Sequence, residues 1–271
     1  GADGLRHVKA EGGMTIVQEP ETVEYDGMPR AAISTGAVDF VLPIDEMAGV
    51  IVPYARHPYV QSRPAATLAD RAPDHFMAIL ALLNAHTDHD FSRYKKGTVT
   101  RRIDRRMGIR QISHPADYLE LLREDREELH CLFKDLLIGV TSFFRDAEAW
   151  DRLEEILTGA ILDKRDEEPF RIWVPGCATG EEAYSVAMLV HELQYRHNRR
   201  LDLQVFATDI DPDAIAAARI AVYPEHIKKD LSNDRLEAFF QPEGDKLRVR
   251  KKLRETCVFA AQNLLSDPPF S

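Results

Sequence analysis

The stretch WVPGCATGEEAYSVAMLVHEL, from Trp173 to Leu193, joins a short apolar run to a helical pattern through a loop of small residues. After the loop, apolar residues recur at three- and four-residue spacing, which is typical of a helix. Gly176 and Gly180 lie within the loop. Glycine lets a backbone approach a ligand closely, and the first amides of a helix are donors without partners. We therefore expect a ligand site where the strand ends and the helix begins.

Two carboxylates stand at the mouth of this helix. Glu181 and Glu182 would compete with a phosphate for the same amides and the same positive helix end, so they argue against a diphosphate ligand. S-adenosylmethionine fits better, because it has a sulfonium, an ammonium and ribose hydroxyls but no phosphate. The dinucleotide fingerprint GxGxxG is also absent, which weakens a nicotinamide or flavin interpretation. The alternative is that both glutamates serve the helix dipole alone.

Strands and helices alternate from this loop to the end of the sequence. "FRIWVP", "LDLQVFATD" and Val258–Ala261 read as strands, whereas residues 181–196 and "PDAIAAARIAVY" read as helices. This alternation predicts a parallel sheet with crossovers, that is, an α/β fold of the Rossmann-like kind. In such sheets ligands bind beyond the carboxyl ends of the strands. Asp209 ends the second strand and would bind ribose hydroxyls, and Asn263 follows the third strand.

Composition divides the rest of the chain into parts. Residues 1–52 read as an α/β remnant, and residues 53–73, with four prolines and no clear period, read as a linker. Residues 74–165 show helical spacing throughout and predict a small all-helical domain, with Asp146 as the N-cap of its last helix. Residues 166–271 would form the cofactor domain. The abrupt beginning and end suggest an excerpt from a longer chain.

Overall composition narrows the classes of function. The 271 residues carry a net charge of −10, which disfavours non-specific nucleic-acid binding by the chain as a whole. No apolar run approaches the ~18 residues of a membrane span, and no signal segment begins the chain. Three scattered cysteines favour a reducing, cytoplasmic setting without disulfides or zinc. His86 and His89 lack a third ligand nearby in the sequence, so we expect no metal site.

Four stretches together resemble the CheR-type chemotaxis receptor methyltransferases over about residues 74–271: "FKDLLIGVTSFFRD", "IWVPGCATGEEAYSVAMLVHEL", "VFATDIDPDAIAAARIAVYPE" and "FAAQNLL". The resemblance implies an all-helical domain followed by a Rossmann-like S-adenosylmethionine domain, here incomplete at its C-terminus. It also implies methyl transfer to glutamates of methyl-accepting receptors, which yields γ-glutamyl methyl esters. A non-catalytic module that holds the cofactor or a receptor is the alternative.

The resemblance also implies roles for individual residues. It places Glu182 at the methionine portion of the cofactor, Asp209 at the ribose, and Asn263 and Leu264 around the adenine. Thr141 and Arg145, from "TSFFR", would line the same pocket beside the Gly176 loop. We expect Arg145 to steer either the attacking carboxylate or the carboxylate of the cofactor. Its alternative is a surface salt bridge before a helix.

A basic stretch offers a surface for the receptor. Residues 93–110 hold eight lysines and arginines and one aspartate. Arg101 with Arg105, and Arg102 with Arg106, lie four residues apart and share a helix face. The resemblance implies acidic methylation helices on the receptor, so we expect these four arginines to dock it. A solvated face that carries phosphate or nucleic acid is the alternative.

The first fifty residues have a resemblance of their own. "GADG…GGMTIVQEPETVEYDGMPRAAISTGAVDFVLP" is similar to the C-terminal end of the CheB-type receptor methylesterases. Asp3 matches the acid of that family's Ser-His-Asp triad. An acid alone orients a histidine and cannot attack an ester, so we expect this remnant to be inactive. The two resemblances together suggest an excerpt from an esterase–transferase fusion.

Overall fold

The computed structural model describes residues 2–61, 68–87, 89–137, 141–166 and 168–268, without the side chains of Ala2, Asp3 and Arg6. The chain divides into two compact units, Gly1–Val140 and Thr141–Ser271, and each is described by itself. The boundary at 165 that the sequence predicted lies one helix later than the boundary between these two units. Helix α10 (Ala147–Asp163) belongs to the second unit because its apolar face is buried in that unit's core.

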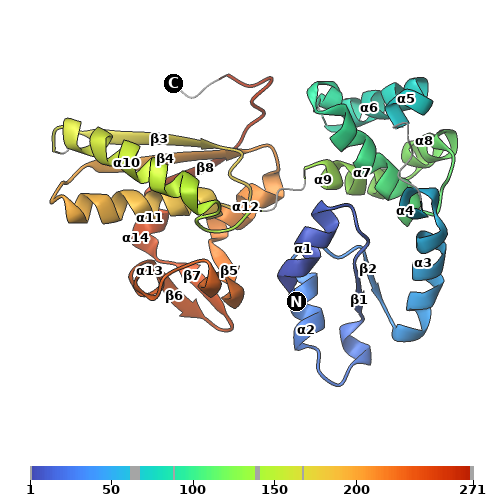
Figure 1. Ribbon diagram of the computed structural model, residues 1–271, viewed down its shortest axis with the longest axis horizontal. Coiled ribbons are helices and arrows are strands. Elements are labelled where there is room, and N and C mark those ends of the chain that lie inside the picture. Colours follow the sequence, from blue (N-terminus) through green and yellow to red (C-terminus); the bar gives the residue numbers. More distant parts are fainter. Residues whose placement is uncertain (1, 62–67, 88, 138–140, 167, 269–271) are drawn as a thin grey trace. The chain divides into compact units, whose positions relative to one another are not determined.

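The first unit begins with the expected α/β segment (Figure 1). Strands β1 and β2 pair in parallel, with Ile16 opposite Phe40. The predicted linker is largely helical where the structure describes it, because α3 continues through Pro53 and two short helices follow. The elements of this part are α1 (Ala2–Ala10), β1 (Ile16–Gln18), η1 (Pro20–Thr22), α2 (Gly27–Ile33), β2 (Phe40–Leu42), α3 (Ile44–Arg56), α4 (Pro58–Gln61) and α5 (Leu68–Arg71).

Helices complete the first unit and confirm the all-helical part of the prediction. They are α6 (Pro73–Thr87), η2 (Phe91–Arg93), α7 (Lys96–Ile109), α8 (Pro115–Glu124) and α9 (Arg126–Leu136). Helices α8 and α9 are separate elements. The chain breaks there because the Asp125 carboxylate accepts hydrogen bonds from the Glu127 and Glu128 amides, both at 2.9 Å, and so caps α9. Helix α7 contacts α4, α5 and α9 and is buried from Val99 to Ile109 apart from Arg101.

The second unit contains the predicted parallel sheet. Its strands lie in the order β3-β4-β8 and all pair in parallel. Helix α11 packs on β4, α12 packs on β4 and β8, and α10 packs against α11. In this sheet Pro175 lies opposite Thr208 and Asp209 lies opposite Ala261, so the three strands end at one edge. The elements are β3 (Pro169–Pro175), α11 (Glu181–Arg196), β4 (Asp202–Asp209), α12 (Pro212–Ile220) and β8 (Cys257–Ala261).

A small antiparallel sheet interrupts this unit between α12 and β8 (Figure 1). Its strands lie in the order β5-β7-β6, and it shares one hydrophobic core with the parallel sheet through Tyr223, Phe240 and Val249. Its strands are too short to show a clear alternating pattern in the sequence. The elements are β5 (Val222–Pro224), η3 (Glu225–Lys229), α13 (Asn233–Phe239), β6 (Phe240–Glu243), β7 (Lys246–Val249) and α14 (Lys251–Arg254).

Candidate active site

The glycine loop between β3 and α11 is tied to the neighbouring strand. Gly176 and Gly180 have φ angles of +69° and +96°, a region that glycine adopts without strain. The Cys177 amide donates a hydrogen bond to the Thr208 carbonyl at 3.0 Å. A Cβ atom on Gly180 would lie 2.9 Å from the Cβ of Ala218. The loop therefore needs glycine at position 180 for both its backbone angle and its packing.

Asp209 holds the loop in place from the end of β4. Its Oδ2 accepts a hydrogen bond from the Ala178 amide at 2.8 Å, and its Oδ1 accepts one from the Asp211 amide at 2.9 Å. A carboxylate can accept about four hydrogen bonds, so acceptor capacity remains for the hydroxyls of a ligand. The sequence predicted Asp209 beside the loop, and the structure brings the two together.

The two glutamates at the helix mouth have different environments. Glu181 is buried, with 4% of its surface exposed, and its Oε2 accepts a hydrogen bond from the Thr179 hydroxyl at 2.6 Å. Glu182 is exposed. Partial burial raises the pKa of the Glu182 carboxyl, and the positive charge of Arg145 opposes that rise. Glu181 thus stabilises the loop, whereas Glu182 remains available to a ligand.

Arg145 and Thr141 belong to the loop that opens the second unit. The Arg145 side chain is 57% exposed, and its Nε lies 3.9 Å from Asp146 Oδ2. Its charge acts on Glu182, so the structure brings these two predicted residues together. Thr141 is half-buried. The prediction that Asp146 caps α10 is only half right, because the residue precedes the helix with φ +62° but its carboxylate makes no capping hydrogen bond.

Asn263 and Leu264 follow β8, next to the end of β4. The Gln262 amide donates a hydrogen bond to the Asp209 carbonyl at 2.9 Å, which places this turn beside Asp209. The Asn263 side chain stabilises the turn, since its Oδ1 accepts a hydrogen bond from the Leu265 amide at 3.0 Å. Leu264 is 53% exposed.

Sequence reasoning missed the residues that support the site. Ser185 is fully buried in α11; its hydroxyl donates to the Glu181 carbonyl at 2.7 Å and accepts from the Phe144 amide at 3.1 Å. The Tyr223 hydroxyl donates a hydrogen bond to the Thr179 carbonyl at 2.7 Å. The Ser185–Phe144 and Tyr223–Thr179 hydrogen bonds join residues that are about 40 positions apart in the sequence. No local sequence pattern signals contacts of this kind.

Cys177 is a buried core residue and not a nucleophile. Only 1% of its surface is exposed, and burial raises the pKa of its thiol to about 12. The thiol is therefore neutral at physiological pH and the thiolate needed for attack is scarce.

The expected receptor-docking face on α7 is not exposed, which corrects the prediction for three of its four arginines. Arg102, Arg105 and Arg106 have 5%, 0% and 7% of their surface exposed, respectively. Arg101 is half-buried, and its Nη2 donates to the Ala10 carbonyl at 3.3 Å. The i, i+4 spacing did place these residues on shared faces, but those faces point into the first unit.

Arg105 is the centre of a buried charge network. Its guanidinium donates to the carboxylates of Asp39 and Asp135 and to the Gly13 carbonyl at 2.9 Å. Lys9 lies 3.3 Å from both of these carboxylates. The network joins the α/β segment to helices α7 and α9 and provides the charge balance that lets an arginine be buried.

The other buried arginines have partners as well. Arg102 donates to the Lys9 carbonyl at 2.7 Å. The Arg106 guanidinium makes a bidentate pair with Glu128, which also accepts from the Tyr118 hydroxyl at 2.8 Å. Because these groups are engaged inside the unit, they cannot offer their charge to a receptor in this arrangement.

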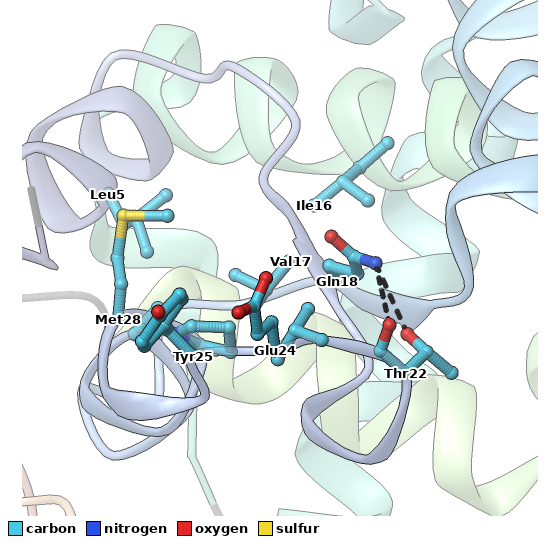
Figure 2. Close-up of a pocket in the computed structure, with 11 residues that line it drawn as sticks. Leu5, Ile16, Val17, Gln18, Thr22, Glu24, Tyr25 and Met28 are labelled. Carbon is cyan, nitrogen blue, oxygen red and sulfur yellow. Dashed lines mark hydrogen bonds between the residues drawn. The ribbon is translucent and has the colours of Figure 1, made fainter.

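A separate apolar pocket of about 540 Å³ lies in the α/β segment (Figure 2). Figure 2 shows Met28, Tyr25 and Glu24 on one side of it and Gln18 hydrogen-bonded to Thr22 on the other. The pocket lining contains none of the predicted site residues. It is therefore unrelated to the glycine loop.

Two findings concern metals and membranes. The His86 Nδ1 lies 2.9 Å from the Leu82 carbonyl of its own helix, and the His89 ring packs on Phe133 at 5.1 Å, so the two histidines have separate local partners. Among the helices that the structure describes, none combines the length and the apolar character needed to cross a membrane.

Family models match the chain in three consecutive parts. Residues 1–51 match the CheB methylesterase, and residues 74–137 match the all-alpha domain of the CheR methyltransferase. Residues 139–271 match the SAM-binding domain of the CheR methyltransferase, which makes S-adenosylmethionine the cofactor of this domain. The start of this match agrees with the boundary between the two structural units.

Curated relatives point the same way. The chain is 39% identical, over its whole length, to 31% of an uncharacterized 104.1 kDa protein in the hypE 3' region of Rhodobacter capsulatus. It is 29% identical to chemotaxis protein methyltransferases of Listeria monocytogenes and Escherichia coli, over 66% and 71% of this chain respectively and 66% of each relative. The chain thus spans about a third of the first relative and just under two thirds of the other two. With both of its models matched in order, the chain belongs over residues 74–271 to the CheR methyltransferase family.

Proposed function

We propose that this protein transfers a methyl group from S-adenosylmethionine to glutamate side chains of chemotaxis receptors. The match to the SAM-binding domain supports S-adenosylmethionine as the methyl donor. The relatives named chemotaxis protein methyltransferases support chemotaxis receptors as the methyl acceptors. The observation that carries the proposal is the hydrogen bond between Asp209 and the Ala178 amide. It holds a carboxylate acceptor against a glycine loop at the edge of a parallel sheet, where a nucleoside without phosphate fits.

The residues present suit this cofactor. Among the residues that the structure describes, none has an atom within 4 Å of a Cβ atom built on Gly176, so that side of the loop is open. Asp209 has acceptor capacity for ribose hydroxyls, and Glu182 offers a carboxylate to the ammonium of the methionine portion. Asn263 and Leu264 would frame the adenine. The negative charge at the helix mouth disfavours a pyrophosphate group in the same place.

The reaction needs alignment more than it needs acid–base catalysis. The bound sulfonium supplies an activated methyl group. A glutamate carboxylate has an ordinary pKa near ~4.3 and is already ionised at neutral pH, so no general base is required. The new bond joins a carboxylate oxygen to the methyl carbon while the carbon–sulfur bond breaks. Aligning these atoms and excluding water are the tasks of the protein.

Arg145 would steer one of the carboxylates toward this geometry. Its side chain is exposed and its charge reaches Glu182, so it lies within the electrostatic range of the site. A guanidinium binds a carboxylate through two parallel hydrogen bonds, which fixes orientation as well as position. Thr141 begins the same loop and would line the pocket beside it.

Binding and turnover can be tested separately. Calorimetric titration with S-adenosylhomocysteine should show binding, and titration with NADH should not. Replacing Asp209 by alanine should weaken the binding of S-adenosylhomocysteine by about a hundredfold, since both a ribose contact and the loop hydrogen bond are lost. The matched control is Asp202→Ala, at the other end of the same strand, which should bind normally.

Turnover is measured by transfer of a radiolabelled methyl group to receptor fragments. Base-labile label on receptor glutamates is the expected result. Binding of S-adenosylhomocysteine without any transfer would instead establish a non-catalytic module. Tight binding of NADH at the glycine loop would overturn the proposal altogether.

A further inference from the structure

The loop that carries Arg145 has an unusual backbone. Phe144 has a φ angle of +48°, and Asp146, two residues later, has +62°. Positive φ is rare for residues other than glycine, and for a bulky side chain it is a strained state. Such strain persists only where the surrounding contacts fix the residue in place. Something must therefore hold Phe144.

Three side chains contact Phe144. Its amide donates to the buried Ser185 hydroxyl at 3.1 Å. Its ring packs on Trp150, with 4.9 Å between ring centroids. On the ring face, the guanidinium carbon of Arg235 lies 3.6 Å from the centroid, which is the geometry of a cation–π contact.

Arg235 is itself held rigidly. Its Nε and Nη2 donate to the two carboxylate oxygens of Glu192, both at 2.8 Å. Both side chains are about one-quarter exposed, so the pair is partly shielded from water. Glu192 lies on α11, the helix whose first turn carries Glu182, and Arg235 lies on α13, beside the antiparallel sheet. The pair thus fixes a guanidinium plane over the Phe144 ring.

The neighbouring residues carry this restraint to Arg145. Trp150, which packs on Phe144, donates a hydrogen bond from its indole nitrogen to the Arg145 carbonyl at 2.6 Å. Phe143 is buried against the antiparallel sheet, edge-on to Tyr223 and Phe240 at 5.0 and 5.5 Å between centroids. The backbone is therefore fixed on both sides of Arg145, while its side chain is 57% exposed.

We propose that Arg235, oriented by Glu192, is a positioning residue for the cofactor site: it holds the strained Phe144 and so sets the place of Arg145. This inference rests on the proposed function, since it assumes that Arg145 acts on the cofactor or the substrate. The role differs from that of a core residue, because about one-quarter of the Arg235 side chain is exposed and it is not part of the hydrophobic core. The antiparallel sheet and α13 thereby help to build the site in the parallel sheet.

The test compares two substitutions of Arg235 in the full chain. Arg235→Gln removes the charge, and we expect S-adenosylhomocysteine to bind about tenfold more weakly. Arg235→Lys keeps a cation over the ring and an ion pair with Glu192, so it should recover most of that loss. Glu192→Gln should weaken binding in the same direction as Arg235→Gln. The matched control is Arg152→Gln, which removes an equally charged side chain from an exposed pair on α10 and should bind like the native protein.

A spectroscopic measurement separates positioning from simple loss of stability. Near-ultraviolet circular dichroism, recorded well below the unfolding temperature, should change in Arg235→Gln because the Phe144–Trp150 contact loosens, and it should not change in Arg152→Gln. Equal binding by native protein and Arg235→Gln would overturn the inference and leave the proposed function standing. Failure of the native protein to bind S-adenosylhomocysteine would instead reject the proposed function.

Discussion

Gly180 is the residue on which the shape of the cofactor loop depends most directly. Replacing it by alanine forces a side chain into φ +96° and brings its Cβ to 2.9 Å from Ala218 and 3.1 Å from the Tyr223 hydroxyl. We expect Gly180→Ala to destabilise the second unit by about 2–3 kcal/mol and to weaken S-adenosylhomocysteine binding, because the loop must shift. Urea unfolding and calorimetry measure the two effects.

The control for this substitution is Gly159→Ala on the exposed face of α10. A Cβ atom there meets no atom of the described part of the chain within 4 Å, and alanine favours a helix over glycine by about 1 kcal/mol. Gly159→Ala should therefore stabilise the second unit slightly and leave binding unchanged. If Gly180→Ala behaved in the same way, the loop would be adaptable and its glycine dispensable.

Sequence alone predicted that several candidate site residues lie together, but not that their environments differ. Gly176, Asp209 and Asn263 could be placed at one edge because parallel strands end together. The difference between Glu181 and Glu182 could not be predicted. The burial of Glu181 depends on its contact with Thr179 and on packing that no short sequence pattern encodes. The Arg235–Phe144 contact was equally hidden, because it joins residues about 90 positions apart.

At the scale of elements, helix α7 shows the clearest difference between pattern and structure. The i, i+4 arginines were expected to form a receptor-docking surface, with a solvated face as the alternative. In the structure the α7 arginines Arg105 and Arg106 form ion pairs with carboxylates. One of these carboxylates belongs to the residue just before β2, and the others belong to α9. The partners lie 22 to 66 residues away, so only the tertiary structure could reveal them.

The Arg106–Glu128 pair gives a prediction at this scale. Both groups are buried, and Glu128→Gln would leave a buried guanidinium without its counter-charge. Breaking a buried pair by removing one partner costs about 3–5 kcal/mol, and we expect a loss of this size in the first unit. Chemical denaturation followed by far-ultraviolet circular dichroism measures it.

The double variant Arg106→Met with Glu128→Leu provides the control. It replaces both charges by apolar groups of similar length, so most of the loss should be recovered. The Tyr118 hydroxyl loses its acceptor in the double variant, which limits full recovery. A double variant as unstable as Glu128→Gln would show that packing, and not charge balance, governs this part of α7.

At the scale of the whole molecule, the Arg105 network joins the methylesterase-like segment to the helical domain. Burial by itself would raise the pKa of Asp39, but the charges of Arg105 and Lys9 outweigh it and hold that pKa below its usual 3.8. A lowered pKa means that the unfolded chain binds the proton more readily. The stability that Asp39 contributes is therefore complete well above pH 4 and is lost as the pH falls through the lowered folded-state value.

Asp39→Asn should remove this pH dependence. We expect the variant to be less stable than the native protein at pH 7, and the difference to shrink between pH 5 and pH 3, because the Asp39 carboxyl of the unfolded chain binds a proton there more readily than the native one. Urea unfolding across this range measures it. Asp26→Asn, which alters an exposed pair with Arg30, serves as the control and should change little. A constant difference at all pH values would show that the ionisation of Asp39 does not contribute.

The two structural units should also respond independently, and the tryptophans allow each to be followed. Each unit has its own hydrophobic core, and both tryptophans of the chain, Trp150 and Trp173, lie in the second unit. Tryptophan fluorescence during urea unfolding therefore reports on the cofactor unit, whereas far-ultraviolet circular dichroism reports on both.

S-adenosylhomocysteine at about 100 times its dissociation constant should raise the free energy of unfolding of the second unit, followed by fluorescence, by about 2.7 kcal/mol. The part of the circular dichroism change that comes from the first unit should stay at the same urea concentration. Asp39→Asn should lower the stability of the first unit alone, which changes the circular dichroism transition but not the fluorescence transition. A single transition that shifts as a whole in both experiments would mean that the units unfold together. The buried charges of the first unit would then contribute to the stability of the cofactor site as well.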